Sequence, residues 1–354
     1  MSKAIAFADR ASGVALGLIA LANLLFVLSV LAVLLVGVNG ARASALPICS
    51  GTNMLEQLQR DDPGKIEDIR RQAEAMPNGH GLLWKIEKDG AEPSFLFGTM
   101  HLTDERVTRL TDKAQAAFNA ADTVIIETTD VLDEQAAALS LMRHPELMML
   151  PGTTTLKSLL SPEQAEIVDA ALNDRGIPLG SVSKMQPWML ATMVAIPACE
   201  FARRKGGLKV LDVKLARDAA ATGKTVAGLE TAIEQLQAMA SLPLELHVES
   251  LVETMKLGDR IGDVYETMVD LYQTGEVGMI WPLFRAVLPS KEDEGYAEFE
   301  ETMVTSRNRG MAENAEPFLQ QGGAFIAVGA LHLPGEKGLV ELLRRAGYRV
   351  TRAD

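Results

Sequence analysis

Two similar stretches near opposite ends of the chain decide the fold: FLFGTMHLTDERV (Phe95 to Val107) and FIAVGALHLPGEKG (Phe325 to Gly338). Each begins with an apolar run typical of a buried strand and continues with Gly-x-x-His and a leucine. The 354 residues contain only five histidines, so the repetition in matching contexts is a specific signal. It predicts two strand ends whose histidines, His101 and His332, share one site.

The other segments complete the pattern of an α/β protein. Further strands are expected at 82–87, paired with 94–98 as a hairpin, and at 123–127, 224–228 and 348–351. Helical periodicity predicts helices at 107–121, 300–320 and 336–346 and a mostly helical middle from about 131 to 275, with helix starts at Ser161-Pro162-Glu163 and at the Thr231-x-x-Glu234 capping box. The polar stretch 59–80 and the acidic stretch 290–295 are expected to be loops.

These elements predict an α/β fold: a mixed central sheet with strands from both ends of the chain and a large helical middle section. In such sheets, functional sites form at the carboxyl ends of the strands. Both Gly-x-x-His motifs occupy strand ends, and so does Glu127, which directly follows the apolar run 123–126. The three residues are therefore expected to meet.

The N-terminal residues have the composition of a targeting segment. Residues 13–40 carry no charge, and Ala43-x-Ala45 fits a signal-peptidase site. Residues 1–45 are therefore expected to be either a cleaved signal peptide or an uncleaved membrane anchor. Both alternatives predict an exported protein, periplasmic or membrane-anchored and facing the periplasm, with residues 46–354 as its functional domain.

Charge and cysteine content narrow the possible partners. The formal net charge is −13, and no run of five basic residues occurs, so nucleic acid is not an expected partner. The two cysteines, Cys49 and Cys199, either form one disulfide or are two unrelated buried thiols. Neither belongs to a CxxC motif, so a thiolate zinc site is not expected.

The residue types at the strand ends suit a metal ion. Neutral imidazole binds Zn, Mn, Co or Fe, and Glu127 adds a hard carboxylate beside His101 and His332. Two histidines and one carboxylate with open positions are typical of catalytic metal sites. A single Gly-x-x-His after a strand is usually an ordinary loop histidine, so the prediction depends on the pair.

The order of these motifs resembles the TraB/GumN family, whose eukaryotic relatives include the Tiki proteases and whose superfamily includes erythromycin-esterase-like and haem-binding ChaN-like proteins. The matching pieces run from CSGTNMLEQL (49–58) through both Gly-x-x-His motifs, QPWMLA (186–191), 210–237 and SRNRGMAE (306–313). The resemblance implies a divalent metal ion, Mn, Co or Zn, held by His101, His332 and Glu127, with Arg307 as a further signature residue. The zinc-protease motif HExxH is absent.

Three other polar residues are candidates for the site. Arg307 could bind substrate or stabilise a developing oxyanion, or form an ordinary salt bridge on a helix surface. Asn308 could orient a ligand or face solvent. Glu230 could be a second catalytic carboxylate or an acid that stabilises a helix N-terminus.

Together these features predict an exported metal-dependent hydrolase that acts on peptide or protein substrates. The alternative is a non-catalytic periplasmic binding or regulatory protein for a peptide, haem or a metal. Residues 13–40 would supply any membrane attachment.

Overall fold

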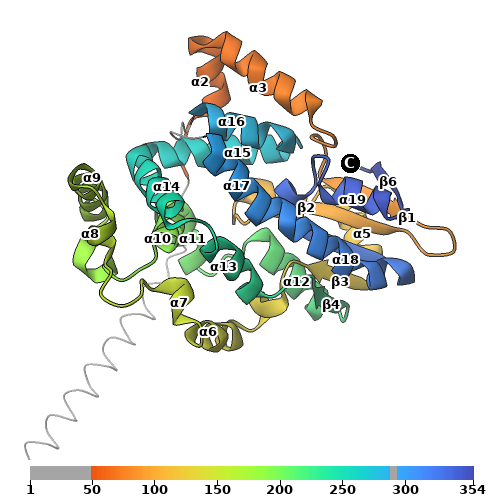
Figure 1. The fold of residues 1–354 in the computed structure, drawn as a ribbon. Helices are drawn as coiled ribbons and strands as arrows, with labels where there is room; N and C mark the ends of the chain where they lie inside the picture. Colours follow the sequence, from red (N-terminus) through yellow and green to blue (C-terminus); the bar gives the residue numbers. More distant parts are fainter. Residues whose placement is uncertain (1–48, 288–292) are drawn as a thin grey trace, which may run out of the picture. The chain divides into compact units, whose positions relative to one another are not determined.

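Strands from both ends of the chain pair in one mixed six-stranded sheet (Figure 1). The computed structural model describes residues 49–287 and 293–354. The strands are β1 (Leu83–Glu87), β2 (Ser94–Thr99), β3 (Thr123–Ile126), β4 (Thr225–Gly228), β5 (Ala324–Gly329) and β6 (Arg349–Arg352), in the spatial order β4-β3-β5-β2-β1-β6. The first four in this order are parallel, whereas β1 is antiparallel to both β2 and β6. The predicted α/β class, mixed sheet and hairpin are confirmed.

The two Gly-x-x-His motifs follow neighbouring parallel strands. β2 pairs with β5 from Phe95 opposite Phe325 to Thr99 opposite Gly329. Parallel strands end at the same edge of a sheet, so both motifs leave the sheet side by side. This pairing between distant parts of the chain places the candidate site.

Helices cover the sheet and form the middle of the chain, as predicted (Figure 1). Up to the middle they are α2 (Met54–Asp61), α3 (Pro63–Ala75), α4 (Glu105–Thr108), α5 (Asp112–Ala120), α6 (Glu134–Met142), α7 (Pro145–Met148), α8 (Leu156–Leu159), α9 (Pro162–Asn173), α10 (Pro187–Val194), α11 (Ala198–Lys205) and α12 (Leu211–Ala221). The later ones are α13 (Ala232–Ala240), α14 (Leu244–Leu257), α15 (Ile261–Gln273), α16 (Ile280–Val287), α17 (Asp293–Glu300), α18 (Ser306–Gln321) and α19 (Leu339–Arg345).

Side chains of the central strands alternate between two buried layers. Phe325 and Ala327 of β5 pack with α3, α5, α12, α15 and α16 on one face. Ile326 and Val328 pack with α18 and α19 on the other face. Because both faces are covered, these strands are continuous apolar runs rather than alternating ones.

A third apolar cluster lies apart from the sheet, in the helical middle. It joins α8, α9, α10 and α14 through buried residues that include Leu156, Leu172, Leu190 and Leu251. The predicted helix start at Ser161 is confirmed, because its hydroxyl and Gln164 form a reciprocal capping box on α9. Thr231 and Glu234 cap α13 in the same way.

Several predicted boundaries are wrong for local reasons. The expected helix 107–121 is two helices, because Thr111 caps a new start at Asp112. Most of the expected loop 59–80 is helical: α2 and α3 meet at Asp62, which caps α3 ahead of a proline. Of the second predicted loop, residues 290–292 lie outside the described residues, and residues 293–295 are the start of α17.

The predicted localisation is corrected. No helix within residues 49–287 or 293–354 is long and apolar enough to cross a membrane. Residues 1–45, on which the expectation of a periplasmic or membrane-anchored protein depended, lie outside the described residues. That expectation therefore has no structural support.

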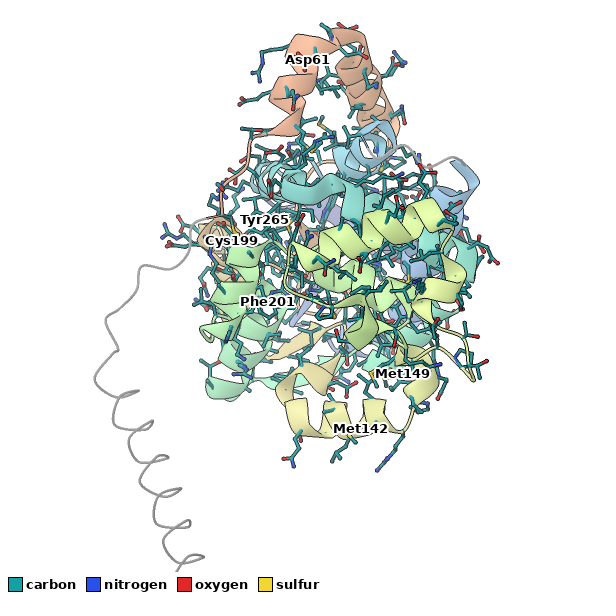
Figure 2. All side chains as sticks on the ribbon, turned by 90° about the vertical axis from the view of Figure 1, so that its left-hand side faces the viewer. Asp61, Met142, Met149, Cys199, Phe201 and Tyr265 are labelled. Carbon is teal, nitrogen blue, oxygen red and sulfur yellow. A yellow bond between two sulfur atoms is a disulfide. The ribbon has the colours of Figure 1, made fainter. Side chains whose placement is uncertain are left out.

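The two cysteines form a disulfide. The Cα atoms of Cys49 and Cys199 lie 5.2 Å apart, within the usual range for a disulfide. Figure 2 shows the bond beside the labelled Cys199. Of the two alternatives open from the sequence, the disulfide is the one the structure shows.

Asp104 caps α4 in a buried polar cluster. Its carboxylate accepts hydrogen bonds from the backbone and side chain of Arg106 and from Arg203. Burial raises the pKa of Asp104, but these hydrogen bonds and charges outweigh it and lower the pKa to about 2. The ionised carboxylate therefore stabilises the fold.

Asp104→Asn is expected to lower the free energy of unfolding at pH 7 by roughly 2 kcal/mol. An Asp whose folded pKa is depressed stabilises the fold above its unfolded pKa, about 4, and that contribution is lost as the pH falls towards 2. The difference between variant and wild type should thus shrink from pH 4 to pH 2 in urea titrations. Asp68→Asn, at an exposed acid paired with Arg71, is the control; equal effects of both variants at pH 7 would contradict this account.

Candidate functional site

The candidate site residues follow the carboxyl ends of the four parallel strands. Glu230 follows β4, Glu127 directly follows β3, and His332 and His101 follow β5 and β2. The strand order β4-β3-β5-β2 therefore places the two carboxylates and the two imidazoles along one edge of the sheet. This is where α/β sheets form their sites.

His332 is buried, with only 6% of its side chain exposed. Its Nδ1 lies 2.6 Å from Asn308 Oδ1, while Asn308 Nδ2 donates to the carbonyl of Lys337 at 2.9 Å. Because the amide nitrogen is used by Lys337, Asn308 presents its oxygen to the ring, and His332 Nδ1 carries the proton. Burial lowers the pKa of His332 to about 4, so the ring is neutral and its Nε2 has a free lone pair.

Glu127 is a buried carboxylate with several partners. Its Oε1 accepts a 2.7 Å hydrogen bond from Gly329 N and lies 3.8 Å from His332 Nε2, and its Oε2 accepts from Arg307 Nη2 at 2.6 Å and Gln235 Nε2 at 3.0 Å. Burial alone raises the pKa of Glu127, but the neighbouring imidazoles, the guanidinium and the Gly329 N–H outweigh it and lower the pKa to about 2. The carboxylate is therefore ionised.

His101 differs from its counterpart because 62% of its side chain is exposed. Its Nδ1 donates to Asp212 Oδ2 at 2.7 Å, and Thr99 donates its hydroxyl proton to the other oxygen of the same carboxylate. The charge of Asp212 raises the pKa of His101 to about 9. Asp212 thus holds the ring through Nδ1 and leaves Nε2 for another partner.

Arg307 joins the two glutamates. Its Nη2 contacts both Glu127 and Glu230, its Nε lies 3.1 Å from each oxygen of Glu230, and its Nη1 donates to the carbonyl of Met303 at 3.0 Å. Gln235 also donates to Glu230, at 2.9 Å. Only 13% of the Arg307 side chain is exposed, so it is not the surface salt bridge that the sequence left open.

A π-helical turn precedes Arg307. Residues Glu301–Thr305 form this turn, and α18 continues from Ser306 with Arg307 and Asn308 one after the other. Such turns change the angular position of the residues that follow, and they are frequent at functional sites. The two neighbouring side chains reach Glu127 and His332, respectively.

The glycines of the two motifs permit close approach rather than an unusual backbone angle. Neither Gly98 nor Gly329 has a positive φ, so neither position requires a backbone conformation that favours glycine. A Cβ atom on Gly98 would lie 2.6 Å from a methyl carbon of Leu333 and 3.1 Å from Ala330. A Cβ atom on Gly329 would lie 3.2 Å from Glu127 Oε1 and 3.4 Å from His332 Cδ2. The first glycine admits the second loop, and the second glycine makes room for the site.

The donors suit a divalent cation in kind. His332 Nε2 and Glu127 Oε1 are buried and unprotonated, and each imidazole is fixed through its Nδ1. Within residues 49–287 and 293–354, however, no three His, Cys, Asp or Glu side chains lie close enough together to hold a metal ion. His332 and Glu127 therefore lie beside each other, whereas the exposed His101 does not form a three-residue cluster with them.

Sequence reasoning missed two residues of this network, Asp212 and Gln235. Asp212 stands in the first turn of α12 and Gln235 in the first turn of α13, where polar side chains are common at any helix. Their sequence positions carry no signal for the site. The remaining histidines have other partners: His144 contacts Glu146, His247 the carbonyl of Met239, and His80 contacts Glu276.

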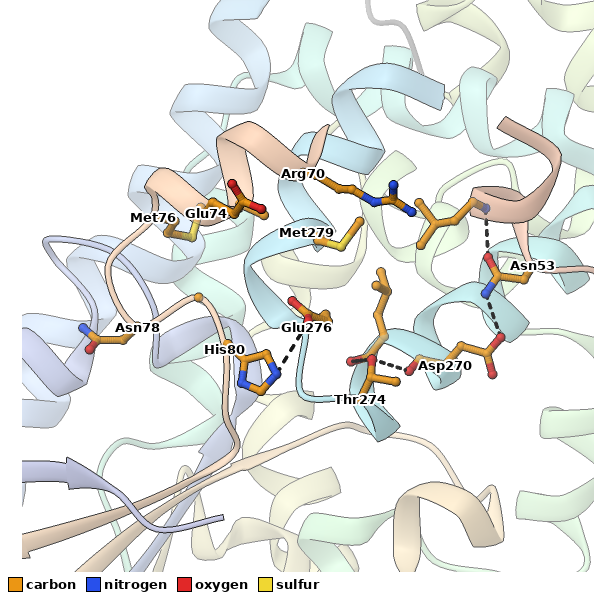
Figure 3. Close-up of a pocket in the computed structure, with 14 residues that line it drawn as sticks. Asn53, Arg70, Glu74, Met76, Asn78, His80, Asp270, Thr274, Glu276 and Met279 are labelled. Carbon is orange, nitrogen blue, oxygen red and sulfur yellow. Dashed lines mark hydrogen bonds and ion pairs between the residues drawn. The ribbon is translucent and has the colours of Figure 1, made fainter. Parts of the chain in front are cut away.

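A large cavity lies elsewhere. It measures about 690 Å³, is bounded by α3, α15 and the turn around His80, and none of the candidate site residues lines it (Figure 3). Among the residues that line it, His80 pairs with Glu276 at 3.5 Å. The candidate site is thus defined by its buried polar contacts and not by this cavity.

The fold and site define an α/β protein with two histidine motifs at adjacent strand ends. The chain belongs to the TraB/PrgY/gumN family, whose family model matches residues 82–352. It is similar to Metalloprotease TIKI1 of Danio rerio, at 24% identity over 77% of this chain and 63% of the relative, and to that of Homo sapiens, at 24% over 77% and 62%. Metalloprotease TIKI homolog of Nematostella vectensis is 22% identical over 77% of this chain and 67% of its own length. The chain spans less than two thirds of the length of both TIKI1 proteins, and no solved structure matches it.

The two motif glycines are expected to respond differently to alanine. Gly98→Ala should lower the free energy of unfolding by about 1–3 kcal/mol, because the added methyl group overlaps Leu333. Gly329→Ala should instead displace Glu127 or His332, seen as shifted imidazole signals of His332 in NMR spectra. Gly310→Ala, at a helical glycine with open space around its Cβ position, is the control. Unchanged His332 signals in Gly329→Ala would contradict the proposed crowding.

Proposed function

We propose that this protein is a metal-dependent hydrolase whose divalent ion is held by His332, Glu127 and His101. The observation that carries the proposal is the Nδ1 anchoring of both imidazoles, by Asn308 and by Asp212. Metal-binding histidines are usually held in this way, with the other ring nitrogen free for the metal. The names of the curated relatives, all metalloproteases, support the same chemistry.

Charge balance also favours a cation at this edge. The carboxylates of Glu127, Glu230 and Asp212 face one buried guanidinium, that of Arg307, and one exposed imidazole. A bound cation would reduce the remaining negative charge, and His101 would release its Nε2 proton to solvent when that nitrogen binds the metal. Because its ring is exposed, we propose His101 as the third metal ligand beside His332 and Glu127.

The chemistry that a bound divalent ion supplies is a lower pKa for a water molecule and polarisation of a carbonyl group. Glu127 is the carboxylate placed to accept a proton beside His332. Arg307 holds both glutamates in position, and we assign to it the stabilisation of the negative charge that develops on the carbonyl oxygen of the substrate.

Two predicted roles change in emphasis. Glu230 is held by Arg307 and Gln235. We therefore propose that it positions Arg307 and affects proton transfer only indirectly, through the position of that guanidinium. Asn308 is buried against His332, so we assign it to positioning that ring instead of to direct contact with substrate.

The proposed substrate is a peptide or protein. The choice of substrate depends on the names of the relatives. The proposed metal is Mn, Co or Zn. Incubation of the purified protein with a mixture of peptides and each of the three metals, followed by mass spectrometry, tests both. A haem Soret band or retained metal without any peptide cleavage would favour the binding-protein alternative.

His332→Ala and His101→Ala are expected to abolish metal retention and peptide cleavage, because each removes one of three proposed ligands. Elemental analysis of the purified proteins measures the first effect and a peptide assay the second. His144→Ala is the control. It removes a histidine that contacts Glu146 and none of the proposed ligands, so it should behave as wild type. Full activity in a metal-free His332→Ala protein would rule the proposal out.

Asn308→Ala is expected to weaken metal binding about 10- to 100-fold, because the His332 ring loses the acceptor that fixes its tautomer. Isothermal titration with Mn²⁺ measures the affinity. Asn314→Ala is the matched control, since Asn314 lies on the same helix and donates one hydrogen bond to the carbonyl of Leu229. Equal affinities for the two variants would show that Asn308 has no special role.

A further inference from the structure

The loop that carries His101 has few internal hydrogen bonds. Residues 100–104 lie between β2 and α4 without regular secondary structure, and within them Leu102 N donates to the carbonyl of Met100 at 2.8 Å. The His101 side chain is itself mostly exposed. Its position therefore depends on whatever holds the main chain of this loop.

Helix α11 holds that main chain at two points. Arg204 Nη2 donates to the carbonyl oxygen of His101 at 2.6 Å, and Glu200 accepts from the backbone N–H and the hydroxyl of Thr103 at 3.0 and 2.7 Å. Arg204 Nε also donates to Glu200 at 2.9 Å, so the two side chains form one unit. A third residue of α11, Arg203, donates to Asp104 at 3.2 Å.

Glu200 is a buried carboxylate of α11 whose partners connect this helix to the His101 loop. It is fully buried, and a buried carboxylate must be paired to be tolerated. Its partners are Thr103, Arg204 and the hydroxyl of Tyr265 at 3.4 Å. Thr103 belongs to the His101 loop, and Arg204 and Tyr265 each also contact a residue of that loop.

The disulfide anchors the start of α11. Cys199, next to Glu200, is bonded to Cys49. The residues after Cys49 are attached to α15: Thr52 N donates to Asp263 at 2.7 Å, and Met54 N donates to Thr267 at 2.8 Å. Figure 2 labels Cys199 and Tyr265 of α15 close together on this face. The covalent bond thus ties α11 to α15, from which Tyr265 also reaches Glu200.

We infer that Arg204 and Glu200 are positioning residues that hold the first Gly-x-x-His motif, and that the Cys49–Cys199 disulfide keeps α11 in place to do so. The second motif needs no such support, because His332 is buried against Asn308. These contacts hold the loop in the metal-free protein, and only their consequence for metal binding rests on the proposed function.

Hydrogen exchange of the metal-free protein tests the inference directly. Arg204→Ala and the double variant Cys49→Ser/Cys199→Ser should each speed exchange of the Leu102 and Thr103 amides roughly tenfold at a temperature where both proteins remain folded. Exchange in α9 should not change. Arg175→Ala, which removes an arginine that donates to the carbonyl of Ala171, is the matched control.

A double-mutant cycle tests whether the disulfide acts through α11. If it does, combining Arg204→Ala with loss of the disulfide should add little to the exchange rates of either change alone, because both release the same loop. Fully additive effects would overturn the role given to the disulfide. Unchanged exchange at Leu102 and Thr103 in Arg204→Ala would overturn the inference as a whole.

Titration with Co²⁺ alone then connects the loop to the site. Arg204→Ala should bind Co²⁺ about tenfold more weakly than wild type, with a changed visible absorption spectrum, while Arg204→Lys, which retains a donor for the His101 carbonyl, should recover part of the affinity. Wild-type affinity in Arg204→Ala would contradict a positioning role at the metal. Absence of Co²⁺ binding in wild type would instead count against the proposed function and leave the exchange result to decide the inference.

Discussion

The parallel pairing of β2 with β5 is the constraint on which the rest of the site depends. It joins residues 95–99 to residues 325–329, in a register that sets Thr99 opposite Gly329. The pairing is close because Gly98 has no side chain where Ala330 and Leu333 pack. Everything that follows at the sheet edge, including the neighbouring position of Glu127 after β3, inherits this register.

The second organising feature is buried charge. Arg307 stands between Glu127 and Glu230, and each carboxylate has an additional donor, Gly329 N for the first and Gln235 for both. Burying ions without such partners would cost several kcal/mol each. Helix α18 enters this network directly after a π turn, and its consecutive residues Arg307 and Asn308 reach Glu127 and His332.

The two histidine motifs are alike in sequence and unlike in environment. His332 is buried and neutral, held by an amide, whereas His101 is exposed and held by a carboxylate that favours its charged form. In the proposed function, a divalent ion would meet a preformed pair in His332 and Glu127 and a more accessible donor in His101. Of the two motif loops, the His101 loop is the one that α11 holds through Arg204 and Glu200.

The sequence alone determined the α/β class, the strands that precede His101, Glu127 and His332, the capping boxes of α9 and α13, and the expectation that these three residues share an edge. Apolar runs, period and caps are local properties, so they can be read from neighbouring residues. Only the tertiary structure decided that Asp212, Gln235 and Asn308 orient those side chains, that the glycines serve close approach, and that Cys49 pairs with Cys199. These contacts join residues far apart in the chain, and their distances are fixed by how the helices pack on the sheet, which no local pattern encodes.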